Sequence, residues 1–291
     1  MSTTVNDWLE GARLRTLPAA AAPVLAGAGI AAGAGGFSFP RSLLALLVAL
    51  LLQIGCNFAN DYSDGIRGTD DFRTGPPRLT GGGKVRPKTV LAVALGCFAA
   101  AAVLGLVLVA LSGKWWLLLA GLAAIIAAWF YTGGKHPYGY LGIAEFFVFV
   151  FFGLMATVGT VYVQLAHAPL SAWLAGAGMG LYSCALLMVN NIRDIPTDQE
   201  AGKNTLAVRL GDTRSRRTYV AYLVFAPVLI GIGLHSHPIV IVAVVALEVA
   251  GIITCLPLVR GARGKALLAV LANTGKLTLG AGVITFLAAL I

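Results

Sequence analysis

The chain is poor in charged residues, and acidic residues are the scarcest of them. Only 11% of its 291 residues are charged, less than half of the roughly 25% found in soluble globular domains. The mean hydropathy is +0.85. This composition excludes an ordinary soluble domain and indicates an integral membrane protein. The four cysteines form no C-x-x-C pair, so the sequence gives no support for a zinc site or a redox motif.

Long uncharged runs predict membrane-spanning helices. A helix needs about 20 residues to cross the hydrocarbon layer, so the run from Phe146 to Ile192, which is interrupted near Pro169, must hold two crossings. We therefore expect an all-α, polytopic membrane protein with nine transmembrane helices around a central cavity. The expected helices lie near residues 17–35, 41–61, 89–112, 115–133, 141–164, 170–191, 216–235, 238–259 and 274–291.

The distribution of lysine and arginine predicts the orientation in the membrane. These residues accumulate in short loops on the cytoplasmic side. If the N-terminus is cytoplasmic, Arg41 and Lys114 alone among the 21 Lys and Arg residues fall on the outer side. The net charge of +9 then follows largely from membrane topology, and no nucleic-acid partner is needed to explain it. We expect the N-terminus and the polar loops to be cytoplasmic.

Most of the aspartates lie in two short segments. Six of the eight belong to NFANDYSDGIRGTDD and NNIRDIPTDQEAGK. In the first segment Asn60 is followed four residues later by Asp64. In the second, the same spacing joins Asn190, Asp194 and Asp198. Residues four apart share one face of a helix, so each segment predicts a ladder of oxygen ligands at the cytoplasmic end of a helix.

The two segments also indicate an internal repeat. A shift of 130 residues superimposes Asn60 on Asn190 and Asp64 on Asp194. Each motif then ends the second helix of a four-helix block, and an even number of crossings per block makes the repeat parallel. The predicted parts of this single domain, 1–291, are two four-helix repeat halves at about 1–135 and 136–260, and an extra ninth helix at 274–291.

Two facing ladders of this kind suit a hard cation. Mg²⁺ prefers oxygen ligands and usually takes one or two carboxylates together with substrate phosphates. The alternative is that these acids are solvated loop charges or partners of nearby cations. Recurrence at two membrane borders favours metal binding, because an acid costs up to ~2.5–3.5 kcal/mol as it nears the bilayer centre. The predicted metal ligands are Asn60, Asp61, Asp64, Asn190, Asp194 and Asp198.

Basic residues follow both motifs and supply the charge that a phosphate group requires. Arginine binds phosphate oxygens bidentately, while lysine acts as a point charge. We expect Arg67, Arg78 and Lys203 to contact a diphosphate, although positive-inside topology explains basic loops of this kind as well. The segment TGGGKV is not a P-loop, because the residue spacing of that motif is not met.

These features together resemble the UbiA-type intramembrane prenyltransferases, whose first motif reads N-D-x-x-D-x-x-x-D. Within that superfamily the chain is most similar to the branch that prenylates 1,4-dihydroxy-2-naphthoate in menaquinone synthesis. The resemblance covers about a third of the chain. It is carried by the segments RLRTLPAAAAPVLAG, NFANDYSDGIRGTDD, TGPPRL, YTGGKHPYGYLGIAEFFVFVFFG and NNIRDIPTDQEAGKNTLAVRLG.

The resemblance implies a multi-pass enzyme of the bacterial plasma membrane. It implies transfer of a polyprenyl group from a polyprenyl diphosphate to 1,4-dihydroxy-2-naphthoate, with Mg²⁺, release of diphosphate and CO₂, and formation of demethylmenaquinone. The long prenyl tail would lie among membrane lipid. Enzymes that prenylate 4-hydroxybenzoate, haem or chlorophyllide share the metal site, and these acceptors remain alternatives.

The resemblance also assigns residues. It implies catalytic roles for Asp64, Asp194 and Asp198, and for Lys135 of the Tyr131-x-x-x-Lys135 signature, whose lysine also contacts diphosphate. Candidate acceptor-binding residues are Arg15, Tyr131, Tyr138 and Glu145.

Some points stay open at the level of sequence. Gly68 stands where many superfamily members have the last acid of the first motif, so either Asp61 or Asp70 could take its role. Glu248 falls within a predicted helix and has no place in the family pattern, and no residue stands out as the proton acceptor. A CDP-alcohol phosphotransferase is disfavoured because its D-G-x-x-A-R motif is absent. A transporter is also disfavoured, because its acids would be expected near the bilayer midplane, whereas these acids are predicted at one face of the membrane.

Overall fold

The structure is a computed structural model that describes residues 4–69, 78–234 and 238–291. The described residues form helices and loops and contain no strand. The elements are α1 (Val5–Ala12), η1 (Leu14–Thr16), α2 (Pro18–Gly33), α3 (Phe39–Arg67), α4 (Pro87–Ser112), α5 (Leu117–Phe130), η2 (Tyr138–Tyr140), α6 (Ala144–Val148), the π-helical turn η3 (Phe149–Met155), α7 (Ala156–Leu165), α8 (Leu170–Glu200), α9 (Leu206–Leu234), α10 (Pro238–Val259), η4 (Gly264–Ala266) and α11 (Leu267–Ala288).

The helices are long and apolar enough for a multi-pass membrane protein. Within the described residues, seven could cross a membrane by length and composition, or up to eight if the bent pair of Val5–Thr16 and Pro18–Gly33 is one span. That pair is bent by 50°. Helix α5 has 14 residues and is therefore about 21 Å long. The all-helical, polytopic architecture predicted from the sequence is confirmed.

Several helices extend further than the sequence predicted. Helix α3 continues to Arg67 and α8 to Glu200, so both motifs lie inside helices. Helix α3 ends where Gly68 adopts the left-handed conformation, with φ 70°. Helix α11 begins at Leu267, seven residues before the predicted start at Thr274. The predicted bounds stopped at the first charges, but a helix can continue past the membrane border into the polar region, where charges are solvated or paired.

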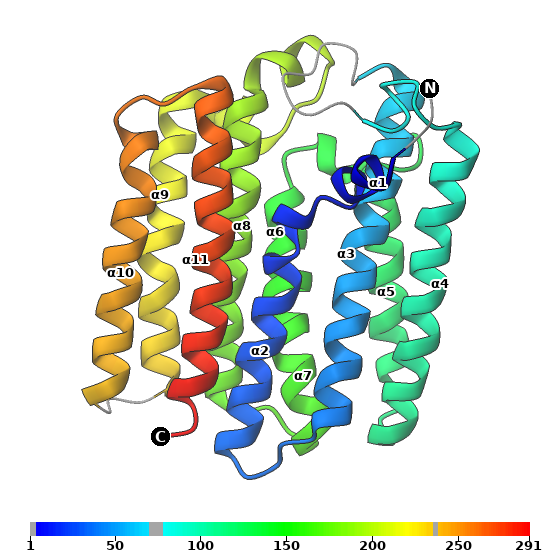
Figure 1. The fold of residues 1–291 in the computed structure, drawn as a ribbon. Helices are drawn as coiled ribbons and strands as arrows, with labels where there is room; N and C mark the ends of the chain where they lie inside the picture. Colours follow the sequence, from blue (N-terminus) through cyan, green and yellow to red (C-terminus); the bar gives the residue numbers. More distant parts are fainter. Residues whose placement is uncertain (1–3, 70–77, 235–237) are drawn as a thin grey trace.

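Both motif helices end on the same side of the bundle. Figure 1 shows the C-terminal ends of α3 and α8 at the top, together with the loop after α5, and α1 lies across this end. We call it the motif end and the opposite side the far end. The connections from α2 to α3 and from α4 to α5 lie at the far end (Figure 1), so Arg41 and Lys114 are located there.

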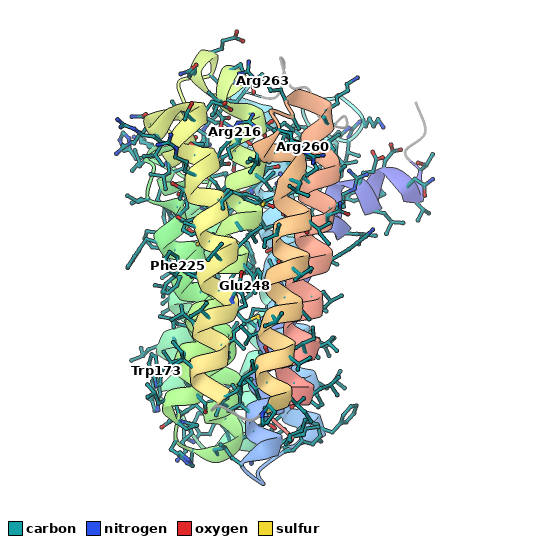
Figure 2. The ribbon with its side chains drawn as sticks, turned by 90° about the vertical axis from the view of Figure 1, so that its left-hand side faces the viewer. Trp173, Arg216, Phe225, Glu248, Arg260 and Arg263 are labelled. Carbon is teal, nitrogen blue, oxygen red and sulfur yellow. The ribbon has the colours of Figure 1, made fainter. Side chains whose placement is uncertain are left out.

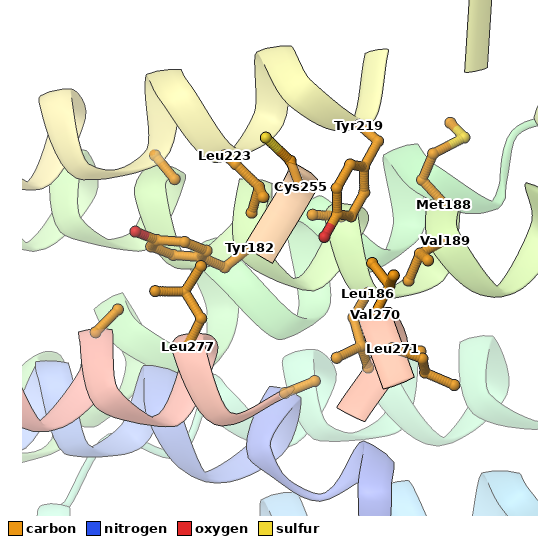
Figure 3. Close-up of a cluster of buried hydrophobic side chains, with 14 of the residues drawn as sticks. Tyr182, Leu186, Met188, Val189, Tyr219, Leu223, Cys255, Val270, Leu271 and Leu277 are labelled. Atoms are coloured by element: carbon orange, nitrogen blue, oxygen red, sulfur yellow. The ribbon is translucent and has the colours of Figure 1, made fainter. Parts of the chain in front are cut away.

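The largest hydrophobic core joins α8 to its neighbours α9, α10 and α11. Tyr182 and Tyr219 are fully buried within it, beside Leu223 and Leu277 (Figure 3). The Tyr219 hydroxyl shares a hydrogen bond of 2.7 Å with the Thr274 hydroxyl. These contacts hold α8, and with it the second motif, against the C-terminal helices.

Small residues permit the closest approaches between helices. A Cβ atom added to Gly153 would come within 2.4 Å of the Gly180 Cα, and one added to Gly29 would come within 2.3 Å of the Phe286 Cα. Such distances leave no space for a side chain. The backbones of η3 and α8, and those of α2 and α11, therefore pack directly against each other, as small residues allow in membrane bundles.

The outer face of α9 and α10 shows the charge distribution of a membrane protein. Phe225 is exposed in the middle of this face, while Arg216, Arg260 and Arg263 gather toward the motif end (Figure 2). Glu248 lies in the middle of the same face, between α9 and α10 (Figure 2). An apolar middle with basic residues at one end is what a bilayer favours.

Candidate active site

The two motifs meet at a single large cavity inside the bundle. Its volume is about 1460 Å³. The cavity is lined by Asn60 and Asp64 from α3 and by Asn190, Asp194 and Asp198 from α8. Residues 130 positions apart in the chain therefore face the same space at the motif end. This juxtaposition is the central feature of the site.

Asp64 is held by partners from two other segments. Its carboxylate pairs with Lys203, whose Nζ lies 3.1 Å from Oδ2, and it accepts a hydrogen bond from the Tyr140 hydroxyl. The residue is only 6% exposed. Burial, followed by the charge of Asp64, raises the pKa of Tyr140, so the phenol stays protonated and continues to donate. A lysine from the loop after α8 thus neutralises an acid of α3.

Asn60, at the start of the first motif, is bound by Thr132. The Thr132 hydroxyl donates to Asn60 Oδ1 over 2.5 Å, and both side chains are buried. Thr132 follows α5 directly, and it lines the cavity together with Asn60. The chain after α5 therefore reaches the first motif with a threonine hydroxyl.

Asp61 has a different environment from the other motif acids. It is fully buried, and its two carboxylate oxygens accept the backbone N–H groups of Leu79 and Thr80 at 3.0 and 2.8 Å. The cavity lining does not include it. Both oxygens therefore hold the chain just before α4, and the metal role of Asp61 stays a prediction. Asp70, the other candidate, lies outside the described residues.

The second motif carries its own cation. Arg193 donates to both carboxylate oxygens of Asp194, at 2.7 and 2.5 Å, and to Asn190 Oδ1 at 2.8 Å. The Arg193 side chain is 4% exposed. Two parallel bonds from a guanidinium fix a carboxylate in orientation as well as in charge. Arg193 was missed by the sequence analysis, although its place three residues after Asn190 puts these two residues on one side of the helix.

The basic residues predicted to bind diphosphate divide into two groups. Arg78 and Lys203 line the cavity, as does the newly identified Arg193. Arg67 does not: it is exposed, and its guanidinium donates to the backbone carbonyls of Thr132 and Gly134. Lys135 is also exposed and outside the lining.

The positions of Arg67 and Lys135 have a common physical reason. The chain turns sharply after α5 through the glycine pair that precedes Lys135, where Gly134 has φ 77°. This turn carries the lysine to the solvent side, and Arg67 binds the carbonyls of the same turn. The structure therefore does not bring these two predicted diphosphate ligands to the cavity.

Three of the four candidate acceptor-binding residues lie at the cavity. Arg15, Tyr131 and Tyr138 line it. The Tyr138 hydroxyl donates to the Ala127 carbonyl at 2.9 Å, and its ring stacks on Phe147 with centroids 4.0 Å apart. Burial raises the pKa of Tyr138. The rings of Tyr131, Tyr138 and Phe147 therefore form an aromatic wall beside the motif end of the cavity.

Glu145, the fourth candidate, lies behind that wall. It is 6% exposed, and both of its carboxylate oxygens are buried. It does not line the cavity. Asn191 of α8, which interacts with the Glu145 side chain, does line the cavity. The structure therefore brings Glu145 near the site but not into it.

The donor set at the motif end has a clear chemical character. It consists of carboxylate and amide oxygens from two helices together with buried cations. No group of three His, Cys, Asp or Glu side chains that could hold a metal alone occurs in the part of the chain that the structure describes. Mg²⁺ usually takes one or two carboxylates and completes its coordination with substrate phosphates and water. The residues present fit such a shared site, and they do not form an all-protein metal cage.

Comparison with known proteins agrees with this geometry. The model of the UbiA prenyltransferase family matches residues 20–273. The chain is 47% identical over 273 residues to a 1,4-dihydroxy-2-naphthoate octaprenyltransferase of Mycobacterium tuberculosis, which covers 92% of this chain and 91% of that protein. A protein of the same name from Escherichia coli is 39% identical, over 79% of this chain and 78% of its own.

Solved structures share the fold at low sequence identity. A UbiA homolog from Archaeoglobus fulgidus bound to GPP and Mg²⁺ superimposes with a TM-score of 0.71 at 14% identity, over 98% of this chain and 100% of that one. The apo structure of a UbiA homolog from Aeropyrum pernix K1 gives 0.70 at 16% identity, over 93% and 96%. At this identity the likeness shows a common arrangement of helices.

Proposed function

The chain belongs to the UbiA prenyltransferase family, and from that premise we propose that it transfers a polyprenyl group from a polyprenyl diphosphate to 1,4-dihydroxy-2-naphthoate. The products are diphosphate, CO₂ and demethylmenaquinol, the reduced form of demethylmenaquinone, which forms from it only on separate oxidation, for example by air. The observation that supports this most directly is the meeting of both acidic motifs at one cavity. The identity of 47% to a protein named for this acceptor, over 91% of its length, supports the choice of acceptor.

The reaction requires that two charges be stabilised as they form. The allylic C–O bond of the donor breaks, leaving an anionic diphosphate and an allylic cation. A ring carbon of the naphthoate then forms the new C–C bond, and its carboxyl group leaves as CO₂ with loss of the carboxyl proton. Preorganised charges placed where charge develops are often the largest single contribution to catalysis.

The motif end supplies the groups for the departing diphosphate. We propose that Asp64, Asp194 and Asp198, with Asn60 and Asn190, hold Mg²⁺, which supplies positive charge against the diphosphate when bound. Arg78 and Lys203 would contact the diphosphate oxygens directly. All seven line the cavity. Asp61, Arg67 and Lys135 are outside this set, because they do not line the cavity.

The aromatic wall is proposed to lie beside the allylic cation, the second ion that forms when the donor ionises. Tyr138 and Phe147 stack at the motif end, and Tyr131 packs edge-on against Tyr138 with centroids 5.5 Å apart. Ring faces attract cations, so these side chains suit the allylic cation and the flat acceptor. Arg15 at the rim is the proposed partner of the acceptor carboxylate.

We also propose the finer architecture and the orientation. Counting α5 and the bent first pair with the seven spans gives nine crossings, arranged as repeat halves near 1–135 and 136–260 with α11 as the extra helix. The motif end is proposed to face the cytoplasm of a bacterium, because Arg41 and Lys114 lie at the far end while most other basic residues are on the motif side. Labelling of single cysteines introduced at Lys114 and Lys203 with an impermeant thiol reagent, in a background without the native cysteines, tests this. Reaction of Lys203→Cys from outside the cell contradicts the orientation.

The function is tested with purified protein in detergent. We expect formation of demethylmenaquinol, identified by mass together with the demethylmenaquinone that air oxidation gives, from a polyprenyl diphosphate and 1,4-dihydroxy-2-naphthoate in the presence of Mg²⁺, and no product when EDTA is added. Equimolar 4-hydroxybenzoate in the same reaction is the control for acceptor choice. Prenylation of 4-hydroxybenzoate with no naphthoate product contradicts the proposed acceptor.

A further inference from the structure

The cavity continues well beyond the motif end. Past the aromatic wall it is bounded by α4, α5 and α7, and its lining reaches Trp116 and Tyr162 near the far end. The lining of this part consists mainly of Ala, Gly, Val, Leu and Ile side chains. The space is therefore one continuous chamber, polar at the motif end and apolar over most of its length.

Three glycines from three helices border the distal part of this chamber. Gly105 of α4, Gly121 of α5 and Gly159 of α7 line the cavity, and a Cβ atom added to any of them would meet no atom within 4 Å. Glycines at helix contacts differ from these three, since Gly153 and Gly180 are in contact with neighbouring backbone. The three cavity glycines therefore do not serve helix packing. Each leaves open space where a side chain would stand.

The three positions lie at a similar depth. Gly105 is seven residues before the end of α4 at Ser112, and Gly121 is four residues after the start of α5 at Leu117. At 1.5 Å per residue, both lie within about 10 Å of the far end of the bundle. Gly159, six residues before the end of α7, lies at the same level. We call Gly105, Gly121 and Gly159 the glycine level.

An aromatic pair follows the glycine level at the far end. The Trp116 indole N–H donates to the Tyr162 hydroxyl at 3.3 Å, and the two rings meet edge-on with centroids 5.5 Å apart. Both side chains line the cavity. The lining continues to Ala168 and Trp173, so this hydrogen-bonded pair borders the chamber just past the glycine level.

The distance from the site to the glycine level separates short from long donors. Thr132 lies just after α5 and contacts the first motif. Gly121 lies eleven residues before it, which corresponds to about 16 Å along the helix axis. A geranyl chain anchored by its diphosphate at the motif end is too short to pass this level, whereas an octaprenyl chain must extend beyond it.

We propose that Gly105, Gly121 and Gly159 determine the length of the prenyl chain that the enzyme accepts. By leaving the chamber open at the glycine level, they allow a long polyprenyl tail to bury apolar surface down to the Trp116–Tyr162 pair, and such burial is the source of affinity for an apolar chain. This inference rests on the proposed prenyl transfer, and it adds the chain-length class of the donor and the residues that select it.

The experiment replaces each glycine separately with leucine and compares two donors. For Gly105→Leu, Gly121→Leu and Gly159→Leu, kcat/KM is measured with geranyl diphosphate and with octaprenyl diphosphate. We expect the ratio of long to short donor to fall about tenfold or more relative to the unchanged protein, because a leucine side chain occupies the path of the long tail. The rate with geranyl diphosphate should be retained.

The matched control is Gly96→Leu. Gly96 also belongs to α4 and also has no atom within 4 Å of an added Cβ, but it is exposed on the outer surface and does not line the cavity. We expect its donor ratio to equal that of the unchanged protein. Thermal unfolding in detergent checks the fold of each variant. Because the three substitutions are made separately, two variants still test the donor ratio if one of them misfolds.

The outcomes separate this inference from the proposed function. If the unchanged protein transfers a prenyl group but folded leucine variants keep its donor ratio, or lose both donors equally, the glycine level does not select chain length. A shift of the same size in Gly96→Leu also overturns the inference. If the unchanged protein uses neither donor with any aromatic acceptor, the proposed function itself is wrong.

Discussion

The two motifs have the same spacing but are neutralised in different ways. On α3, Asp64 is paired with Lys203, which lies 139 residues away in the chain, and with Tyr140 from η2. On α8, Asp194 is paired with Arg193, its immediate neighbour. The first motif thus depends on contacts of α3 with the loops after α5 and α8, while the second is neutralised within one helix. Equal spacing in the sequence therefore does not imply that the two acids have equivalent partners in the fold.

The comparison predicts that both acids are needed despite their different partners. Asp64→Asn and Asp194→Asn should each lower Mg²⁺-dependent kcat by at least about 100-fold, because each removes a charge that is preorganised at the cavity. Product formation is measured by mass spectrometry, and folding by size-exclusion chromatography in detergent. If either folded variant turns over at a normal rate, the two motifs are not equivalent parts of one site.

Removing the two cations should reveal the difference between the motifs. Lys203→Met leaves Asp64 buried without its cation, which should destabilise the protein by about 3 kcal/mol, and it also releases the loop after α8 from α3. Arg193→Met removes a contact within α8 only. Hydrogen exchange should therefore increase on both sides of the Lys203–Asp64 contact in the first variant, and near residue 194 alone in the second.

A double substitution provides the control for this prediction. In Lys203→Met with Asp64→Asn, no charge remains buried without a partner, so part of the lost thermal stability should return. Equal exchange patterns in Lys203→Met and Arg193→Met would show that the Lys203–Asp64 contact contributes nothing beyond local charge neutralisation.

Asp61 offers a test of anchoring against metal binding within the first motif. Asp61→Asn removes one of the two oxygens that accept backbone N–H groups, and leaving a buried group without its partner should cost about 1–3 kcal/mol. Thermal unfolding measures this loss. The affinity for Mn²⁺, measured by titration in the presence of a diphosphate, should remain close to that of the unchanged protein. A large loss of Mn²⁺ affinity would return Asp61 to the metal set.

The smallest effect is expected at Lys135. The family pattern implies a contact with diphosphate, but the side chain is exposed and lies outside the cavity. Exposed charges contribute about 1 kcal/mol or less, so Lys135→Met should change kcat/KM by no more than about fivefold. The KM for the donor, measured against that of Lys203→Met, is the deciding quantity. A loss as large as that of Lys203→Met would mean that Lys135 acts at the site.

The sequence predicted much of the fold because membrane burial acts on local composition. The apolar runs located the long helices, and the charges between them located the ends, although α3 and α8 extend further than the charges indicated. The four-residue spacing fixes a helix face, and the residues with that spacing line one cavity: Asn60, Asp64, Asn190, Asp194 and Asp198. Glu145 and Lys135 could not be placed, because their orientation depends on how the chain turns after α5.

Other site residues were found only in the structure. Thr132 and Tyr140 carry no motif of their own, and they reach the first motif because the segment between α5 and α6 folds back over α3. The glycine level likewise combines residues of three helices, and no spacing in the sequence links them. Contacts of this kind depend on how separate helices are placed relative to each other.

The sequence by itself determined that this is a helical membrane protein, that its acids form two equally spaced ladders, and that the chain resembles a prenyltransferase. The tertiary structure alone decided which acid each cation pairs with, that Asp61 binds backbone groups, and where the chamber stays open. The physical reason is one of range. Helix periodicity and hydropathy act between residues close in the chain, whereas ion pairing and cavity shape arise between side chains that only folding brings together.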